Sequence, residues 1–163
     1  MDKQDELFTV VDKNDKIIGY YSRYECHHNK KLIHRAIGIV IFNDQGQILL
    51  QKRSRNKDTN PGFYTLSTSG HVDKGETYMQ AAKRELFEEL GIHTPLTKKK
   101  KFIVETDIET EMDCLFSTKH NGPFYPNKEE VDEVKFVNID KLKDMKSKLT
   151  PFAAASLQKL GLL

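Results

Sequence analysis

Three glutamates stand close together in a segment that has the pattern of an amphipathic helix. Glu85 and Glu89 are four residues apart and Glu88 is three residues from Glu85, so the three carboxylates share one side of the expected helix. Like charges at this spacing destabilise an isolated helix by about 0.2–0.5 kcal/mol per pair, and a bound divalent cation reverses that penalty. Carboxylate oxygens suit Mg²⁺ or Mn²⁺ held partly by protein and partly by substrate phosphates. The alternative is a solvated acidic face paired with neighbouring basic residues.

The segment before this helix favours the metal interpretation. Gly70 and Gly75 bracket a loop that must turn sharply, and Glu76 follows at the expected N-terminal end of the helix. Glycine lets backbone approach a phosphate-bearing ligand closely. Thr77 begins a possible capping box with Gln80, and Gly91 marks the end of the helix. An apolar stripe for packing is formed by Met79, Ala82, Leu86 and Leu90.

Other segments predict short strands around this helix. A hairpin is expected near the N-terminus and a second strand pair around the turn 43–46, while the four lysines of 98–101 are expected in a solvated loop. The expected strands are 6–11, 17–21, 36–42, 47–51, 101–108, 111–118 and 134–138, and the expected short helices are 140–146 and 151–160. Strands segregated from a few helices predict the α+β class.

Composition limits the class of protein. The chain has 163 residues with 26 Lys and Arg against 24 Asp and Glu, a net charge of +2. This length predicts one domain, 1–163, with a core and a pocket that need no disulfides. The even charge argues against a binder of nucleic-acid polymers. Cys26 and Cys114 are expected as reduced thiols.

No membrane or export signal is expected. The acidic N-terminus lacks the basic and apolar regions of a signal peptide, and the longest apolar run, 36–42, is far shorter than the ~20 residues that cross a bilayer. The sequence therefore predicts a soluble cytoplasmic protein, not a membrane protein.

The helix and its glycine loop together resemble a known signature. Gly70, Glu76 and the run from Arg84 to Ile92, which reads R-E-L-F-E-E-L-G-I, resemble the complete signature of the Nudix family. The resemblance implies a mixed-sheet α/β/α sandwich with an N-terminal hairpin. It also implies a divalent-metal requirement and attack of water on a diphosphate, usually a nucleoside diphosphate linked to another group.

Particular roles follow from this resemblance. Glu85, Glu88 and Glu89 would bind Mg²⁺ or Mn²⁺, and Arg84 would orient a glutamate through a salt bridge. The backbone carbonyl of Gly70 would complete the metal site. The expected division is a hairpin extension, 1–34, followed by the Nudix core with C-terminal helices, 35–163.

The flanking residues resemble one branch of the family, the type I isopentenyl diphosphate isomerases and their bacterial Nudix relatives, across about residues 6–160. In the isomerases three histidines and two glutamates hold a metal. The residues at matching positions are His27, His34, His71, Glu109 and Glu111. Imidazole with carboxylate suits Mn²⁺, Zn²⁺ or Mg²⁺, so a second divalent metal is expected here. For each histidine taken alone, an ordinary surface or core residue is the favoured interpretation over a metal ligand. The five matches together reverse that preference.

The same resemblance identifies substrate contacts and two departures. Arg53 and Lys57 match positions that hold the substrate diphosphate, and an ordinary basic loop is the alternative. Ser69, also a candidate for substrate binding, stands where the isomerases have a catalytic cysteine, and a hydroxyl is a much weaker acid than a thiol. The chain has no Trp to stack on a carbocation, although Phe152 stands near that place.

The leading hypothesis is therefore a metal-dependent Nudix hydrolase that cleaves a phosphoanhydride bond in a small diphosphate derivative, acting as a monomer or homodimer. One alternative is an isopentenyl diphosphate isomerase that uses Glu111 with an unusual acid. Another is a binding module that senses a diphosphate without catalysis.

Overall fold

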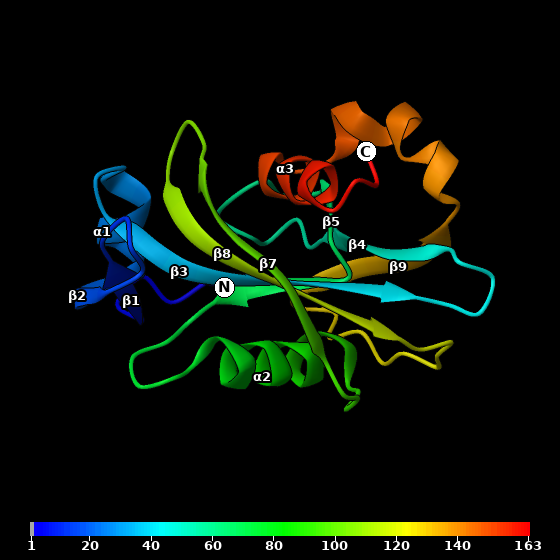
Figure 1. Ribbon diagram of the computed structural model, residues 1–163, viewed down its shortest axis with the longest axis horizontal. Helices are drawn as coiled ribbons and strands as arrows, with labels where there is room; N and C mark the ends of the chain where they lie inside the picture. The colour runs from blue at the N-terminus through cyan, green and yellow to red at the C-terminus, as the bar shows by residue number, and fades with distance from the viewer. Residues whose placement is uncertain (1) are drawn as a thin grey trace.

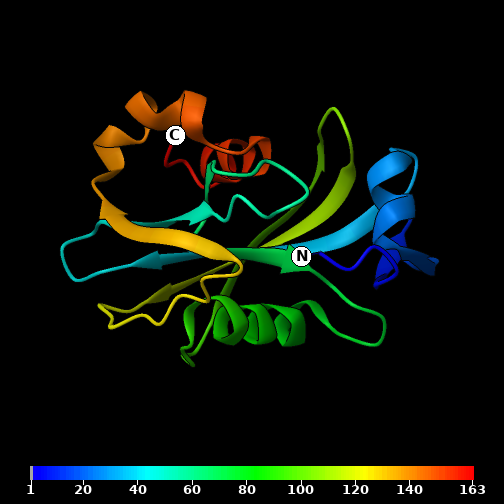
Figure 2. The ribbon, with the colours of Figure 1, turned by 180° about the vertical axis from the view of Figure 1, so that it is seen from behind.

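The computed structural model describes residues 2–163, and its centre is a nine-stranded mixed sheet. Helix α2 covers one face of the sheet, and α3 with two short 3₁₀ helices covers the other, as Figure 1 and the reverse view in Figure 2 show. The strands are β1 Leu7–Val11, β2 Ile17–Ser22, β3 Ile33–Phe42, β4 Ile48–Arg53, β5 Tyr64–Thr65, β6 Thr68–His71, β7 Thr97–Glu105, β8 Thr110–Lys119 and β9 Val131–Val137. The helices are α1 Arg23–His28, α2 Tyr78–Leu90, η1 Ile139–Lys141, η2 Lys143–Lys148 and α3 Pro151–Lys159. The expected mixed-sheet sandwich with an N-terminal hairpin is confirmed.

Strand β3 is the spine of the sheet. It runs parallel to β8 over its whole length and antiparallel to β6 and β1. Its apolar residues are buried on both faces, as expected for a strand covered on both sides. Ile37, Ile39 and Ile41 pack towards α2, whereas Val40 packs in the core beneath α3.

Helix α2 forms as its sequence predicts. Thr77 accepts a hydrogen bond from the backbone of Gln80, and the Gln80 side chain accepts one from the backbone of Thr77, which completes a capping box. Gly91 ends the helix with a left-handed φ of 67°. Leu86 and Leu90 are buried against the sheet, and Glu85 and Glu89 reach the end of the sheet at β6.

Several elements differ from the sequence-based expectation. Helix α1 was not expected, because six residues are too few to show helical periodicity, although Ser22 and Glu25 form a capping box at its start. The four lysines 98–101 lie in the edge strand β7 and not in a loop, and lysine on an edge opposes pairing with another chain. The segment 140–146 lies across two 3₁₀ helices.

Strand pairing also departs from a simple second hairpin. Strand β4 meets β3 only at the pair Phe42 and Ile48, and its long partner is β9. Among residues 2–163, no helix is long and apolar enough to cross a bilayer.

Candidate active site

A cavity of about 590 Å³ opens beside the N-terminal half of β3, between α2 and the segment that precedes β1. The predicted glutamates of α2 line it on one side. Of the second predicted group, the lining includes His71, Glu109 and Glu111 but not His27 or His34. The predicted phosphate ligands Arg53 and Lys57 line the same cavity, as do Ser69 and Phe152.

The three helix glutamates reach this cavity with different exposures. Glu89 is 6% exposed, and its Oε1 accepts hydrogen bonds from Gln51 Nε2 at 3.1 Å and from the backbone of Ser69 at 3.2 Å. Glu85 Oε1 accepts from Arg84 Nη1 at 2.7 Å. Glu88 is the most exposed of the three and lies 3.2 Å from the same nitrogen. Arg84 therefore contacts Glu85 and Glu88, whereas Glu89 accepts hydrogen bonds from neutral donors.

Arg84 ties this group to the loop before α2. Its Nε and Nη2 donate to both oxygens of Glu76, at 2.7 and 2.8 Å. The same Nη2 donates to the backbone carbonyl of His71 at 3.0 Å. A guanidinium fixed on two sides holds the Glu85 carboxylate in one orientation. This arrangement agrees with the orienting role expected for Arg84, which stays a prediction.

Burial controls the charge of these carboxylates. Burial raises the pKa of Glu89 to about 7, although Lys57 and the hydrogen bond from Ser69 oppose the shift. Burial and the nearby Glu89 raise the pKa of Glu85 well above its usual range. Two buried carboxylates that resist ionisation so close together form a site that favours a bound cation.

Gly70 is fitted to Glu85. A Cβ on Gly70 would lie 2.3 Å from Glu85 Cδ, which is closer than atoms can approach. The lack of a side chain therefore lets the carboxylate lie against the backbone of β6. This contact is consistent with the metal-binding carbonyl expected at Gly70.

The Gly70→Ala variant should lose activity more than stability. We expect an overpacking cost of about 1–3 kcal/mol and a fall in kcat of about a hundredfold, since a displacement near 1 Å has that effect on positioned groups. Chemical denaturation and steady-state kinetics measure the two quantities. Gly19→Ala in β2 is the control, because its Cβ meets only the Tyr21 ring, at 3.1 Å. Wild-type kcat in Gly70→Ala would contradict the expectation.

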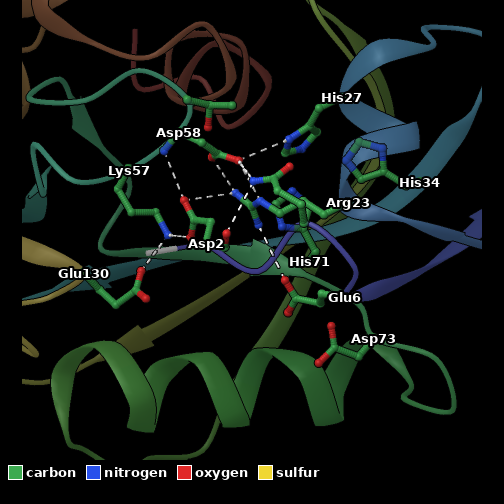
Figure 3. A network of polar contacts seen from close by, with 12 residues as sticks. Asp2, Glu6, Arg23, His27, His34, Lys57, Asp58, His71, Asp73 and Glu130 are labelled. Carbon is green, nitrogen blue, oxygen red and sulfur yellow. Dashed lines mark hydrogen bonds and ion pairs between the residues drawn. The ribbon is translucent and has the colours of Figure 1, made fainter.

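The second predicted cluster is also assembled. Ligand atoms of His27, His34, His71 and Glu109 all lie within 4.8 Å of one another. Glu109 Oε2 is 2.8 Å from His27 Nε2 and 3.3 Å from His34 Nε2. Glu111 Oε1 lies 3.4 Å from His34 Nε2 and 3.6 Å from His71 Nε2. Figure 3 shows the three imidazoles beside the ion pairs of the N-terminal segment.

Strand pairing and one aromatic ring position the cluster. The parallel register places His34 opposite Glu111, and the antiparallel register places Ala36 opposite His71. Phe8 is fully buried and stacks on His71, with ring centroids 4.1 Å apart. Helix α1 adds His27 from outside the sheet. Residues far apart in the sequence therefore converge.

The donor atoms of this cluster fit a divalent metal. Both ring nitrogens of His27 and His34, together with Glu109 Oε2, are buried without a partner in hydrogen-bonding geometry among the described residues. Burial lowers the pKa of His71 to about 3, so this ring keeps a free lone pair. Burial acts in the same direction on His27 and His34, but close polar contacts, including those with the Glu109 carboxylate, outweigh it and raise the pKa of both rings. Neutral imidazoles with carboxylates are ligands for Mn²⁺, Zn²⁺ or Mg²⁺. The His/Glu cluster can hold a metal, and the identity of the ion stays a prediction.

Adjacent residues of β6 serve the two clusters. A Cβ on Gly70 would point at Glu85, whereas the side chain of the next residue, His71, points to the other face of the sheet and joins the His/Glu cluster. The carboxylates of α2 and the His/Glu cluster thus approach the same short strand from opposite faces.

Two charged residues near the site, Asp113 and Arg23, were not predicted from the sequence. Asp113 follows Glu111 on the same face of β8, is fully buried and has no hydrogen-bond partner for either oxygen in the described chain. Burial raises the pKa of Asp113 well above its usual range. The alternation of Glu109, Glu111 and Asp113 at strand spacing was the available signal. Arg23 also lines the cavity, and no local pattern distinguishes it.

The predicted phosphate ligands are held by other groups. Lys57 Nζ lies 2.6 Å from Asp2 Oδ1 and 2.6 Å from Glu130 Oε2. Arg53 donates to the backbone and hydroxyl oxygens of Thr59, at 3.0 and 3.1 Å. Both side chains face the cavity, and their role towards phosphate stays a prediction.

The model of the NUDIX domain matches residues 32–160 of the chain. This protein belongs to the Nudix family. The matched region contains the glycine loop, the glutamates of α2 and most of the His/Glu cluster, although His27 lies before it.

The curated Nudix relatives carry two kinds of name. An isopentenyl-diphosphate Delta-isomerase 2 of Photorhabdus laumondii is 38% identical over 144 residues, which are 85% of this chain and 81% of the relative. An uncharacterised Nudix hydrolase of Yersinia pestis is 33% identical over 153 residues, covering 93% of this chain and 84% of the relative. The expected likeness to the isomerase-like branch is confirmed, and the names divide between hydrolase and isomerase.

Solved structures support the fold. A crystal structure of a Deinococcus radiodurans protein superposes with a TM-score of 0.83 at 20% identity, over 94% of this chain and 98% of that one. At this identity the likeness concerns the Nudix fold alone.

Proposed function

We propose that this Nudix protein is a divalent-metal-dependent hydrolase that cleaves a phosphoanhydride bond of a small diphosphate derivative. The observation that carries the proposal is the complete carboxylate group of α2. Glu85, Glu88 and Glu89 lie together on the cavity, Arg84 fixes Glu85, and Gly70 makes room for it. Burial, together with the nearby Glu89, raises the pKa of Glu85, and carboxylates perturbed in this way cluster at functional sites.

The expected chemistry follows from charge. A diphosphate repels an incoming nucleophile, and Mg²⁺ or Mn²⁺ held by these glutamates would neutralise that charge and lower the pKa of a bound water. Glu89 is one candidate to accept the proton of the attacking water, because it is buried at the cavity beside the other carboxylates of α2. Glu111, buried on the opposite side of the cavity, is the other candidate for this role. Lys57 and Arg53 would bind phosphate oxygens through charge-assisted hydrogen bonds.

A second candidate is isopentenyl diphosphate isomerase. It is favoured by the assembled His/Glu cluster and by the identity with the Photorhabdus laumondii relative. Two residues oppose it. Ser69 provides a hydroxyl where a thiol is expected, and the aromatic side chain near the missing Trp is Phe152, which packs over Gly38 so closely that a Cβ there would lie 2.8 Å from its ring. A carbocation would gain less from phenylalanine than from tryptophan.

One assay separates these functions. The protein is incubated with Mg²⁺ or Mn²⁺ and a panel that includes nucleoside diphosphate derivatives and isopentenyl diphosphate. Released phosphate or pyrophosphate reports hydrolysis, and NMR of the isoprenoid reports isomerisation. We expect hydrolysis of at least one compound and no isomerised product. Isomerisation without hydrolysis would support the second candidate, and ligand binding without turnover would support a binding module.

A further inference from the structure

The first residues of the chain lie across the mouth of the cavity. We call residues 2–6 the N-terminal strap. It is attached by main-chain hydrogen bonds, since the backbone nitrogen of Tyr24 donates to Gln4 at 3.1 Å and that of Arg23 donates to Glu6 at 2.8 Å. The Gln4 side chain donates to Asp58 Oδ2 at 3.0 Å. Asp2, Lys3 and Glu6 all line the cavity, so the strap forms part of its wall.

The carboxylate of Asp2 lies in a site that is built for an anion. Its Oδ1 lies 2.6 Å from Lys57 Nζ, and its Oδ2 lies 3.5 Å from Arg23 Nη2 and accepts from the backbone of Asp58 at 3.1 Å. The Asp2 side chain is only 8% exposed. Cationic side chains and backbone N–H groups are also the groups that bind phosphate oxygens in proteins. Figure 3 shows Asp2 between Lys57 and Arg23.

The charges that line the cavity make the contact between Asp2 and Lys57 important for binding a phosphate. Acidic residues dominate the lining, and Arg84 is already paired with glutamates. Burial opposes the charge of Lys57, but its hydrogen bonds to Asp2 and Glu130 hold its pKa above the usual range. The cation expected to receive a substrate phosphate is therefore fully charged and already neutralised within the chain.

We propose that the Asp2 carboxylate is an internal competitor that occupies a phosphate position of the cavity, and that a diphosphate must displace it from Lys57 and Arg23 to bind. The N-terminal strap then regulates the affinity of the site. Because the ligand class is a diphosphate, this inference rests on the proposed function. The strap itself takes no part in bond cleavage.

The matched variants are Asp2→Asn and Asp5→Asn. Both remove one negative charge from the same strap, but Asp5 is exposed and has no ion pair within residues 2–163. The probe is methylenediphosphonate, a diphosphate analogue that cannot be hydrolysed, and its binding in Mg²⁺ buffer is measured by isothermal titration calorimetry.

We expect Asp2→Asn to bind the probe about tenfold more tightly than wild type, which corresponds to ~1.4 kcal/mol, and Asp5→Asn to stay within about twofold, as distant surface charges do. In a Lys57→Met background the gain from Asp2→Asn should shrink, because the shared partner is gone. Circular dichroism of each variant confirms folding. Equal affinity of Asp2→Asn and Asp5→Asn, including undetectable binding to both, would overturn the proposal.

The result does not depend on catalysis. If Asp2→Asn tightens binding but the wild-type protein hydrolyses no compound of the panel, the strap proposal stands and the hydrolase proposal fails. If the wild type hydrolyses a diphosphate but Asp2→Asn binds the probe as Asp5→Asn does, only the strap proposal fails.

Discussion

The Glu85→Gln variant is expected to lose diphosphate hydrolysis by on the order of a thousandfold in kcat, the scale seen when one preorganised electrostatic group is removed. Glutamine keeps the size of the side chain and its fit against Gly70 but removes the charge that would hold a divalent metal. The salt bridge from Arg84, 2.7 Å long, would also lose its anionic partner. Both changes act on the same carboxylate group.

The measurement is steady-state phosphate release with a substrate found in the panel, at saturating Mg²⁺. Glu129→Gln is the matched control, because Glu129 is an exposed glutamate outside the cavity lining. It should keep wild-type kcat. If Glu85→Gln keeps more than a tenth of the wild-type kcat, the glutamates of α2 do not form the catalytic metal site.

The Glu89→Gln variant should be more stable than the wild type in the absence of metal at pH 8. Burial raises the pKa of Glu89 from 4.5 to about 7 in the folded protein. The folded state therefore binds more protons than the unfolded state between these values, and stability falls as the pH rises through this window. At pH 8 the charged, buried carboxylate costs about 3–4 kcal/mol, at about 1.4 kcal/mol per pKa unit. Glutamine avoids that cost.

Urea unfolding in EDTA at pH 4 and pH 8 tests this prediction. The advantage of Glu89→Gln should appear at pH 8 and vanish at pH 4, where the wild-type carboxyl is protonated in both states. Adding Mg²⁺ should stabilise the wild type more than the variant, because glutamine removes one of the three carboxylates proposed to bind the metal. A variant that is less stable than wild type at pH 8 in EDTA would show that Glu89 is ionised without cost.

The active-site helix could be predicted because its information is local. The capping residues Thr77 and Gln80, the apolar stripe and the glutamate spacing all fall within one short segment, and the structure reproduces each of them. The His/Glu cluster depended instead on resemblance. No local pattern says that His34 and Glu111 face each other, because that requires the parallel pairing of β3 with β8.

The features that were not predicted depend on contacts between residues distant in the sequence or on elements too short to show a pattern. Helix α1 places Arg23 and His27 at the cavity, but its six residues carry no measurable period. The contact of Lys57 with Asp2 joins residues 55 positions apart, and it changes the state of a predicted phosphate ligand from free to paired. The lysines of β7 were misjudged because charge suggests a loop, whereas an edge strand tolerates exposed charge on most of its positions.

Strand β6 has a consequence for how this fold can vary during evolution. Gly70 and His71 are neighbours in the chain, yet one accommodates the carboxylates of α2 and the other belongs to the His/Glu cluster on the opposite face. Substitutions that erode one cluster therefore leave the ligands of the other in place. Loss of one cluster would leave the cavity and the other cluster in place, which is consistent with relatives that are named both as isomerases and as hydrolases.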